Sequence, residues 1–345
     1  MARRAVLLIN LGTPADATVP AVRQFLAEFL SDPLVIRLPR LLRWFNPVLG
    51  RLIAFFRARH ALEMYRTIWT PSGSPLREIS DAQRARLSER LGSIWRVEWA
   101  MRYGKASIPQ QLDELCADGI DEVVIIPLYP QFSGGTTGSA VREIARWAAS
   151  RRPSFRWHVV GSWCREPSYV EAQAAIIAQE LERIGWTADD TFLIFSAHSV
   201  PLSHLRTGDP YREDVEASAS AVAERLKWPS ARYRVAYQSR FGPTAWLGPA
   251  TEEAALALCR SGERRLLVCP ISFVSDCLET LEELAVRLAA QVQEEDAKMV
   301  VCPALNASPP FIDCLAALTE ACTGDRSRSS PIGPSKATDN ETSSS

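Results

Sequence analysis

Short apolar runs alternate with amphipathic stretches along most of the chain. The run from Phe192 to Ala197 is apolar at five of its six positions, which is typical of a strand buried on both faces of a parallel sheet. Similar runs predict strands at residues 5–9, 97–104, 122–130, 155–163, 233–242, 265–276 and 298–305. Helical periodicity separates most of these runs, for example at 140–150, 169–185 and 251–262. This alternation favours parallel sheets with helices on both faces.

The predicted strands fall into two groups of about four, one in each half of the chain. We therefore expect an α/β fold of two similar Rossmann-like, doubly wound lobes with parallel sheets around a central cleft. The expected lobes cover residues 1–165 and 166–305, and a C-terminal helix follows at 306–322. The polar, serine-rich remainder at 323–345 has no periodicity and is expected to be disordered.

The N-terminal apolar run is expected to be a strand and not a secretion signal. Arg3 and Arg4 precede it, as in a signal peptide, but the run at 5–9 is shorter than a usual signal core and turn residues follow it. No run of about 18 apolar residues occurs, so we expect no membrane-spanning segment.

Composition is that of an ordinary soluble protein. Of 345 residues, 47% are apolar and 23% are charged, and the formal net charge of −1 argues against a general nucleic-acid binder. The eight cysteines include no CxxC pair, which argues against a common zinc site or a small disulfide framework. A reducing cytoplasm is the expected location. The sequence carries no signal of an oligomeric state.

One segment departs from the usual surface pattern. Between Pro33 and Leu62 there are six arginines and no acidic residue, interleaved with leucines and aromatic side chains. Such stretches suit the headgroup region of an anionic membrane, so we expect a lip at 33–62 in peripheral contact with the inner membrane face. The alternatives are two core helices with their arginines in water, and an entrance for a flat, apolar, anionic substrate.

Candidate chemistry gathers at two places. His198 follows the strand at 192–197, and ligands bind at the carboxyl ends of strands in such folds, although the histidine could instead cap a turn. Glu279 and Glu283 lie one helical turn apart, at i and i+4. A leucine series marks the core-facing side of the same helix, at Leu278, Leu281, Leu284 and Leu288. Carboxylates near a histidine suit Fe²⁺, while a capping-box-like pair of Asp276 and Glu279 is the structural alternative.

The loop QFSGGTTGS at 131–139 joins a predicted strand to a predicted helix. Its glycines and hydroxyls could hold an anion at the helix N-terminus. It matches neither the P-loop nor the dinucleotide-binding pattern, so a simple turn is the alternative.

Five motifs together resemble the ferrochelatase family. They are LINLGTP, LYPQFSGGTTGS, SAHSVP followed by GDPY, YQSRFGPTAWLGP and SFVSDCLETLEEL, in family order and at family intervals. The resemblance covers about residues 5–320. It implies two Rossmann-like lobes and an enzyme that inserts ferrous iron into a porphyrin to form heme, with release of two protons. Similarity to proteobacterial members favours protoporphyrin IX over coproporphyrin III.

The resemblance also implies roles for particular residues. The family's active-site histidine falls on His198, as proton acceptor, and its essential glutamate on Glu279, as its partner in proton or metal transfer. Both residues would also contact the metal, and Glu283 would extend a path for protons or iron. The implied porphyrin contacts are Tyr129, Trp246 and Phe273, with Arg102, Tyr103, Ser239 and Asp276 also in the cleft. Fe²⁺ is a substrate in this scheme.

Two departures from the family pattern concern cysteines. Cys277 stands where some members have a histidine, so a second imidazole is not essential there. Some members bind a [2Fe-2S] cluster, but Gly134 stands where one such branch has a cysteine, and the tail lacks that branch's cysteine group. The cysteines left as ligands are Cys164, Cys302, Cys314 and Cys322. We expect ordinary buried thiols and no cluster.

Two other functions stay open at this point. A cobalt or nickel chelatase for another tetrapyrrole would keep the fold, but such relatives usually rely on paired histidines. His60, His158 and His204 form no pairing motif with His198. A non-enzymatic porphyrin or heme carrier would need an axial ligand but not the acidic face of Glu279 and Glu283.

Overall fold

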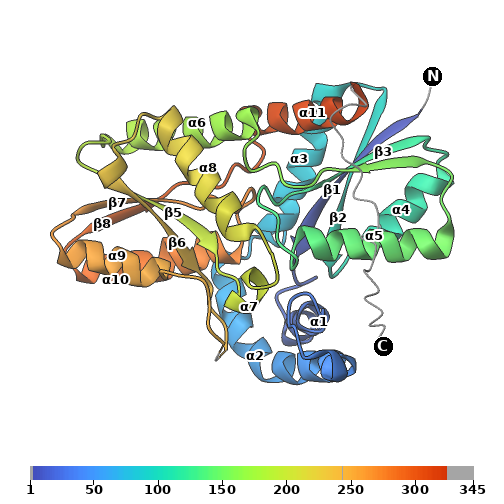
Figure 1. Cartoon of the computed structure of the whole chain (residues 1–345), viewed down its shortest axis with the longest axis horizontal. Helices are drawn as coiled ribbons and strands as arrows, with labels where there is room; N and C mark the ends of the chain where they lie inside the picture. The colour runs from blue at the N-terminus through green and yellow to red at the C-terminus, as the bar shows by residue number, and fades with distance from the viewer. Residues whose placement is uncertain (1–2, 243, 325–345) are drawn as a thin grey trace, which may run out of the picture.

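The computed structural model of the chain describes residues 3–242 and 244–324. These residues form two four-stranded parallel sheets that lie side by side with helices on their faces (Figure 1). The strand orders are β2-β1-β3-β4 and β6-β5-β7-β8. The strands are β1 (Arg4–Gly12), β2 (Trp95–Tyr103), β3 (Glu122–Pro127), β4 (Arg156–Val159), β5 (Phe192–His198), β6 (Tyr233–Gln238), β7 (Arg265–Cys269) and β8 (Lys298–Val301). The repeated order confirms two similar doubly wound lobes.

Helices cover both faces of each sheet. They are α1 (Val19–Leu30), η1 (Arg40–Phe45), α2 (Asn46–Ile68), α3 (Pro75–Leu91), α4 (Ile108–Ala117), α5 (Thr137–Arg151), α6 (Pro167–Ile184), α7 (Leu202–Leu205), α8 (Tyr211–Arg225), η2 (Ser230–Arg232), α9 (Thr251–Arg260), η3 (Glu279–Leu288), α10 (Ala289–Glu294) and α11 (Pro309–Gly324). On the first lobe, α3 and α11 lie opposite α4 and α5 (Figure 1). On the second lobe, α6 and α8 lie opposite α9 and α10.

Several strands end earlier than the hydrophobic pattern predicts. β7 stops at Cys269, before Pro270, and β8 stops at Val301, two residues before Pro303, although the apolar runs continue to 276 and 305. β3, β4 and β6 are also shorter than predicted. Proline has no backbone N–H to donate, so sheet pairing ends near it. The remaining apolar residues lie in loops at the carboxyl edge of each sheet, where ligands bind in this class of fold.

One hydrophobic cluster runs through both lobes. It joins β1 and β3 to β5 and β7 through α6 and α11. Phe311 of α11 is fully buried in this cluster, and its ring stacks on Trp163 with the centroids 6.2 Å apart. The two lobes therefore share one core and are not separated by a break in packing. The lobe boundary near residue 165 stays a prediction. Residues 323 and 324 belong to α11, and the rest of the predicted disordered tail lies outside the described residues.

The basic segment projects below the two lobes in Figure 1, as η1 and α2. Helix α2 packs closely on α1, and a Cβ at Gly50 would lie 2.7 Å from the backbone nitrogen of Ser31. The inner face of α2 is made mostly of small residues for the same reason, among them Ala54 and Ala58. Without these small side chains the two helices could not approach so closely.

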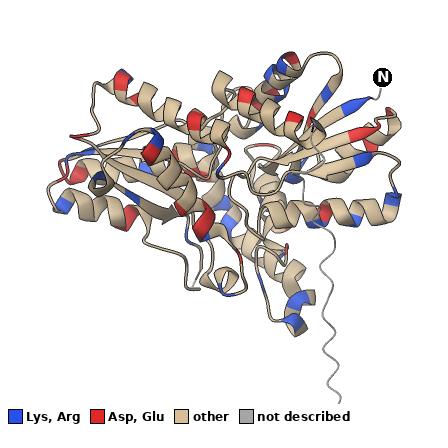
Figure 2. Cartoon of the chain, turned by 45° about the horizontal axis from the view of Figure 1, so that its top comes forward, with Lys and Arg blue, Asp and Glu red and all other residues tan. Residues whose placement is uncertain are grey.

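The outer face of this segment is apolar and exposed. Leu41 is 87% exposed, Trp44 is 74% exposed and Phe56 is 72% exposed. Others exposed on the same segment are Leu42, Phe45, Val48, Leu52 and Phe55. In Figure 2 the projecting segment also carries blue positions, which are arginines. The alternative of two core helices is therefore wrong. Within residues 3–242 and 244–324, no helix has the length and apolar content needed to cross a membrane.

The shared core gives a stability prediction. Phe311→Ala should lower the free energy of unfolding by about 3–5 kcal/mol, because it leaves a cavity between α11 and both lobes. The matched control Phe56→Ala, at an exposed phenylalanine, should change the value by less than about 0.5 kcal/mol. Urea unfolding followed by circular dichroism would measure both, and equal effects would contradict the shared core.

Candidate active site

His198 is the last residue of β5, at the carboxyl edge of the second sheet. Its Nδ1 lies 2.6 Å from the carbonyl oxygen of Ser199, and its backbone N–H donates to the hydroxyl of Ser272 at 3.0 Å. A carbonyl oxygen can only accept, so Nδ1 carries a hydrogen, and in the neutral form of the ring Nε2 has the lone pair. The ring lies against Phe273, with the centroids 6.4 Å apart. The side chain of His198 is therefore held in a fixed orientation by the backbone of the next residue.

The acidic segment is a π-helix, η3, and not the α-helix that the sequence spacing predicts. Leu284 and Leu288 are buried in the core as predicted, while Leu278 and Leu281 are only partly buried. A π-helix closes its hydrogen bonds from i to i+5, so its turn is wider than that of an α-helix. Short π-helical segments are found frequently at functional sites.

The loop before η3 is held by Asp276, which the resemblance places in the cleft. Its carboxylate accepts hydrogen bonds from Asn306 Nδ2 at 2.6 Å and from the hydroxyl of Thr280 at 2.9 Å. Its backbone N–H donates to Asn306 Oδ1 at 2.8 Å, and that of Cys277 donates to Thr280 Oγ1 at 3.1 Å. The capping-box alternative for Glu279 is therefore wrong, because other side chains cap this loop.

Glu279 is the first residue of η3 and is partly exposed. Its backbone carbonyl accepts a hydrogen bond from Gln238, and its carboxylate lies beside the thiol of Cys277. Burial and the nearby charge of Glu279 raise the pKa values of Tyr65 and Cys277 well above their ordinary ranges. Both neighbours are thus neutral at physiological pH.

Glu283, one turn further along, is held by Ser239. Its Oε1 accepts from the backbone N–H of Ser239 at 2.9 Å, and its Oε2 accepts from the hydroxyl of Ser239 at 2.6 Å. The guanidinium of Arg287 lies 3.9 Å away. The structure thus brings together Ser239, which the resemblance places in the cleft, and Glu283, which it places on the path for protons or iron. The hydroxyl of Ser239 is engaged with Glu283.

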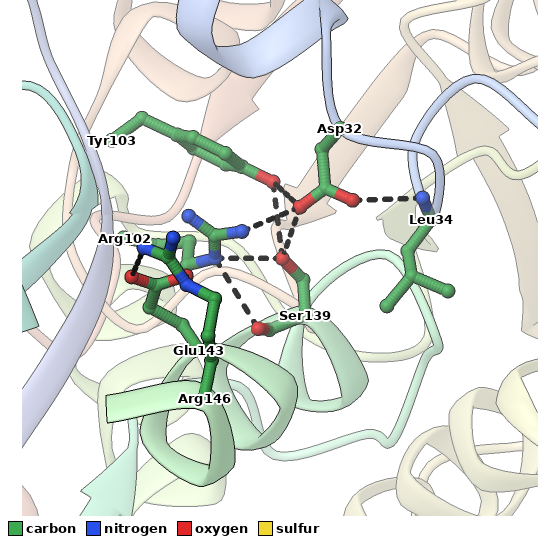
Figure 3. Close-up of polar contacts among 7 residues, drawn as sticks. All are labelled: Asp32, Leu34, Arg102, Tyr103, Ser139, Glu143 and Arg146. Carbon is green, nitrogen blue, oxygen red and sulfur yellow. Dashed lines mark hydrogen bonds and ion pairs between the residues drawn. The ribbon is translucent and has the colours of Figure 1, made fainter. Parts of the chain in front are cut away.

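Arg102 and Tyr103 meet at a buried carboxylate that the sequence analysis missed, Asp32 (Figure 3). Asp32 Oδ2 accepts from Arg102 at 2.7 Å, from the Tyr103 hydroxyl at 2.9 Å and from the Ser139 hydroxyl at 2.6 Å, and Oδ1 accepts from the backbone of Leu34 at 2.8 Å. Burial opposes the charge on Asp32, but these donors together lower its pKa below the ordinary value of 3.8. The network fixes the carboxyl end of β2 to the start of α5.

The predicted aromatic contacts lie in both lobes. Burial, with a smaller effect of Tyr103, raises the pKa of Tyr129 well above its ordinary range, against a lowering effect of Arg102. Its buried hydroxyl finds no hydrogen-bond partner among the described residues. Trp246 donates from Nε1 to the carbonyl of Phe241 at 2.8 Å. Its backbone pairs with Pro201, three residues after His198.

The loop at 131–139 holds a carboxylate of the protein itself. Asp209 accepts from the backbone N–H of Gly134 at 2.8 Å and from the hydroxyl of Ser133 at 3.2 Å. The guanidinium of Arg37, from the basic segment, lies 3.8 Å from the same carboxylate. An external anion would have to compete with Asp209 for these donors. Because Asp209 belongs to the second lobe and also lies near Arg37, its contacts connect the loop to the second lobe and to the basic segment.

The cysteines considered as cluster ligands lie mainly in the hydrophobic core. Cys302 and Cys314 are buried in the cluster shared by the lobes, and Cys322 packs against it. Cys164 is also buried but lies outside that cluster. Among the residues with described positions, no group of three or more histidine, cysteine or acidic side chains could hold a metal ion. The absence of a [2Fe-2S] cluster stays a prediction.

Comparison with known proteins identifies the family. The ferrochelatase family profile matches residues 3–322. The chain belongs to the ferrochelatase family. The ferrochelatase of Stenotrophomonas maltophilia (strain R551-3) is 41% identical over 318 residues, covering 92% of this chain and 97% of the relative. That of Methylococcus capsulatus (strain ATCC 33009 / NCIMB 11132 / Bath) is 40% identical, covering 92% and 96%. The prediction of a metal chelatase of heme synthesis is confirmed.

Solved structures support the fold of this ferrochelatase. The sirohydrochlorin chelatase SirB from Bacillus subtilis subspecies spizizenii, solved with cobalt, has a TM-score of 0.57 at 10% identity and covers 95% of this chain and 98% of its own. DR2241 from Deinococcus radiodurans has a TM-score of 0.51 at 14% identity and covers 93% of this chain but 55% of its own. At such low identity these similarities show the two-lobed chelatase architecture alone.

The Asp32 network gives a prediction with a defined pH dependence. Asp32→Asn should lower the free energy of unfolding by about 3 kcal/mol near neutral pH, because Arg102 would lose its charged partner. The folded-state pKa lies below 3.8, so the stabilisation is complete above that value and is lost as the pH falls through the folded value. The gap between wild type and variant should therefore close in acid. Denaturant titrations at several pH values would measure it, with exposed Asp16→Asn as control, and a gap independent of pH would contradict the assignment.

Proposed function

We propose that this ferrochelatase inserts Fe²⁺ into protoporphyrin IX, with Nε2 of His198 accepting pyrrole protons and Glu279 acting as its partner. The observation that carries the proposal is the hydrogen bond from Nδ1 to Ser199, which leaves the other ring nitrogen as an acceptor. A porphyrin presents two N–H groups and two lone pairs at its centre, so iron enters only as two protons leave. A neutral imidazole suits that transfer near neutral pH.

The two acidic side chains, Glu279 and Glu283, have different proposed roles. The carboxylate of Glu279 lies beside the thiol of Cys277, which is only a weak hydrogen-bond donor. Glu283 has both oxygens engaged by Ser239, so it is held in one orientation. We assign Glu279 to transfer at the ring centre and Glu283 to a path that leads protons or iron along η3. Carboxylate and imidazole groups are suitable ligands for Fe²⁺ that passes from one side chain to the next, since no three of them meet at one point among the described residues.

The substrate must also bend, because a flat ring does not expose its lone pairs to the incoming metal. Aromatic walls at Tyr129, Trp246 and Phe273 can hold a distorted macrocycle, with the strain offset by contacts away from the centre. Protoporphyrin IX is the proposed substrate, and coproporphyrin III is the second candidate because it differs only at the ring periphery, where two propionates replace two vinyl groups. Iron insertion assays with both porphyrins at matched concentrations would decide between them.

The exposed segment 33–62 supports peripheral membrane contact at the cytoplasmic face. Its exposed leucines and aromatic rings could enter the headgroup region while its arginines pair with anionic lipids. Such a position would allow an apolar porphyrin to pass from the membrane into the cleft. The same surface would also serve as the entrance for a flat, anionic substrate, so the two functions of the segment are compatible.

The role of the catalytic pair gives the first functional prediction. His198→Ala should reduce turnover by about 10²- to 10⁴-fold, the usual effect of losing a general base, while porphyrin binding is retained. Glu279→Gln removes the charge at constant size and should also lose turnover. Steady-state iron insertion and porphyrin fluorescence titration would measure the two effects separately.

The control for this prediction is Cys277→Ser, at the neighbouring position. Its thiol is neutral because burial, with Glu279 nearby, raises the thiol pKa, so serine should support normal turnover. Normal turnover in Glu279→Gln would contradict the proposed role of the carboxylate. A folded but inactive Cys277→Ser enzyme would instead indicate thiolate coordination of the incoming iron.

The membrane proposal has its own test. Replacing Arg40, Arg43 and Arg51 with glutamine should weaken binding to anionic vesicles, by about 1 kcal/mol for each arginine that lies near the surface. Activity on detergent-solubilised porphyrin should be largely unchanged. Vesicle co-sedimentation would measure the binding, and absence of wild-type binding at low salt would contradict the membrane contact.

A further inference from the structure

Gln238 is a buried polar residue at the carboxyl edge of the second sheet, and no catalytic role is assigned to it above. It is the last residue of β6, is 4% exposed and pairs in register with His198. Its backbone carbonyl accepts a hydrogen bond from the N–H of Ser199 at 2.8 Å. Ser199 in turn supplies the carbonyl that accepts from His198 Nδ1. The backbone of Gln238 thus holds the group that orients the catalytic histidine.

The side chain of Gln238 reaches the acidic helix. Its Nε2 donates to the backbone carbonyl of Glu279, the first residue of η3, at 2.9 Å. Its Oε1 accepts from the hydroxyl of Ser196 at 2.5 Å, and that hydroxyl also lies 2.8 Å from Thr251 Oγ1. Because the carbonyl oxygen of Glu279 can only accept, the amide nitrogen must face it, which leaves Oε1 to accept from the Ser196 hydroxyl. One residue therefore contacts both the support of His198 and the backbone of Glu279.

The next residue continues the same contact. Ser239 has a φ of +65°, in the left-handed region that residues other than glycine rarely adopt. This turn directs both its N–H and its hydroxyl at the carboxylate of Glu283. Uncommon backbone conformations of this kind are retained where the surrounding structure requires them.

We infer that Gln238 and Ser239 form a positioning corner that sets the distance and orientation between His198 and the carboxylates of η3. Gln238 fixes the start of the π-helix through the carbonyl of Glu279, and Ser239 fixes the carboxylate of Glu283. The inference rests on the proposed roles of His198 and Glu279. Neither residue of the corner exchanges protons with the substrate, so the effect of the corner is on geometry, to which catalysis is sensitive at the scale of 1 Å.

The main test is Gln238→Met, which keeps the length and apolar volume but removes the donor to Glu279. The backbone carbonyl that holds Ser199 stays in place. We expect kcat to fall by about 10- to 100-fold while the KM for porphyrin is unchanged. The matched control is Gln173→Met, because Gln173 is also 4% exposed but lies on α6 and contacts Cys269. The control should keep the wild-type kcat.

A second variant separates positioning from general packing. In Gln238→Glu the carboxyl group can donate to the Glu279 carbonyl only when protonated. The ratio of variant to wild-type kcat should therefore rise as the pH falls, whereas a side chain that only fills space would give a constant ratio. If Gln238→Met does not fold, Ser239→Gly tests the same corner. It keeps the N–H and relaxes the backbone, and loss of the hydroxyl should raise the KM for Fe²⁺ by about 10-fold.

The outcomes distinguish this inference from the proposed function. A kcat of Gln238→Met equal to that of Gln173→Met, together with inactive His198→Ala and Glu279→Gln enzymes, would overturn the positioning corner alone. Normal turnover in His198→Ala or Glu279→Gln would overturn the proposed roles on which the corner rests. A constant activity ratio for Gln238→Glu across pH, or an unchanged KM for Fe²⁺ in Ser239→Gly, would also count against the corner.

Discussion

A chain of buried hydrogen bonds between the two lobes is the constraint on which the site depends. Gln83 of α3, in the first lobe, donates from Nε2 to the hydroxyl of Ser275 at 3.0 Å and to the backbone carbonyl of Asn306 at 2.8 Å. Asn306 continues the chain to Asp276, just before η3. Gln83 is fully buried, so breaking one of these bonds would leave a polar group without water to replace it. The interaction thus sets where η3 begins relative to the first lobe.

The same region connects the exposed segment to the chemistry. Leu278, immediately before Glu279, packs against a cluster formed by α1 and α2 that includes Leu62 and Tyr65. The opposite face of α2 carries the exposed Phe55 and Phe56. A single helix therefore lies between the surface proposed to meet the membrane and the carboxylate proposed to act on the porphyrin.

Much of the architecture could be predicted from the sequence because it is encoded locally. The central strands are continuous apolar runs, as at Phe192 to Ala197, and the motif around His198 is contiguous in sequence. The family resemblance followed from such motifs and is confirmed by the match over residues 3–322. The predicted strand ends were less accurate, because a proline such as Pro270 ends the hydrogen bonding between strands without interrupting the apolar run.

The rest of the site depends on contacts between distant residues. Asp32 meets Ser139, 107 positions later, and Gln238 meets Glu279, 41 positions later. Neither contact has a local signal, since a buried aspartate and a buried glutamine look like surface residues in sequence. The π-helix was also missed. Glu279 and Glu283 are four residues apart and lie on nearly the same face in either an α-helix or a π-helix, so their spacing does not distinguish the two.

The central claim is that His198 is held as the Nδ1–H tautomer with Nε2 free to accept a proton. Long-range ¹H–¹⁵N correlation spectra of protein labelled at its four histidines would test it directly, with His198→Ala used to assign the signal. We predict that His198 shows a protonated Nδ1 and an unprotonated Nε2 at neutral pH. A spectrum in which His198 carries its proton on Nε2 would contradict the account.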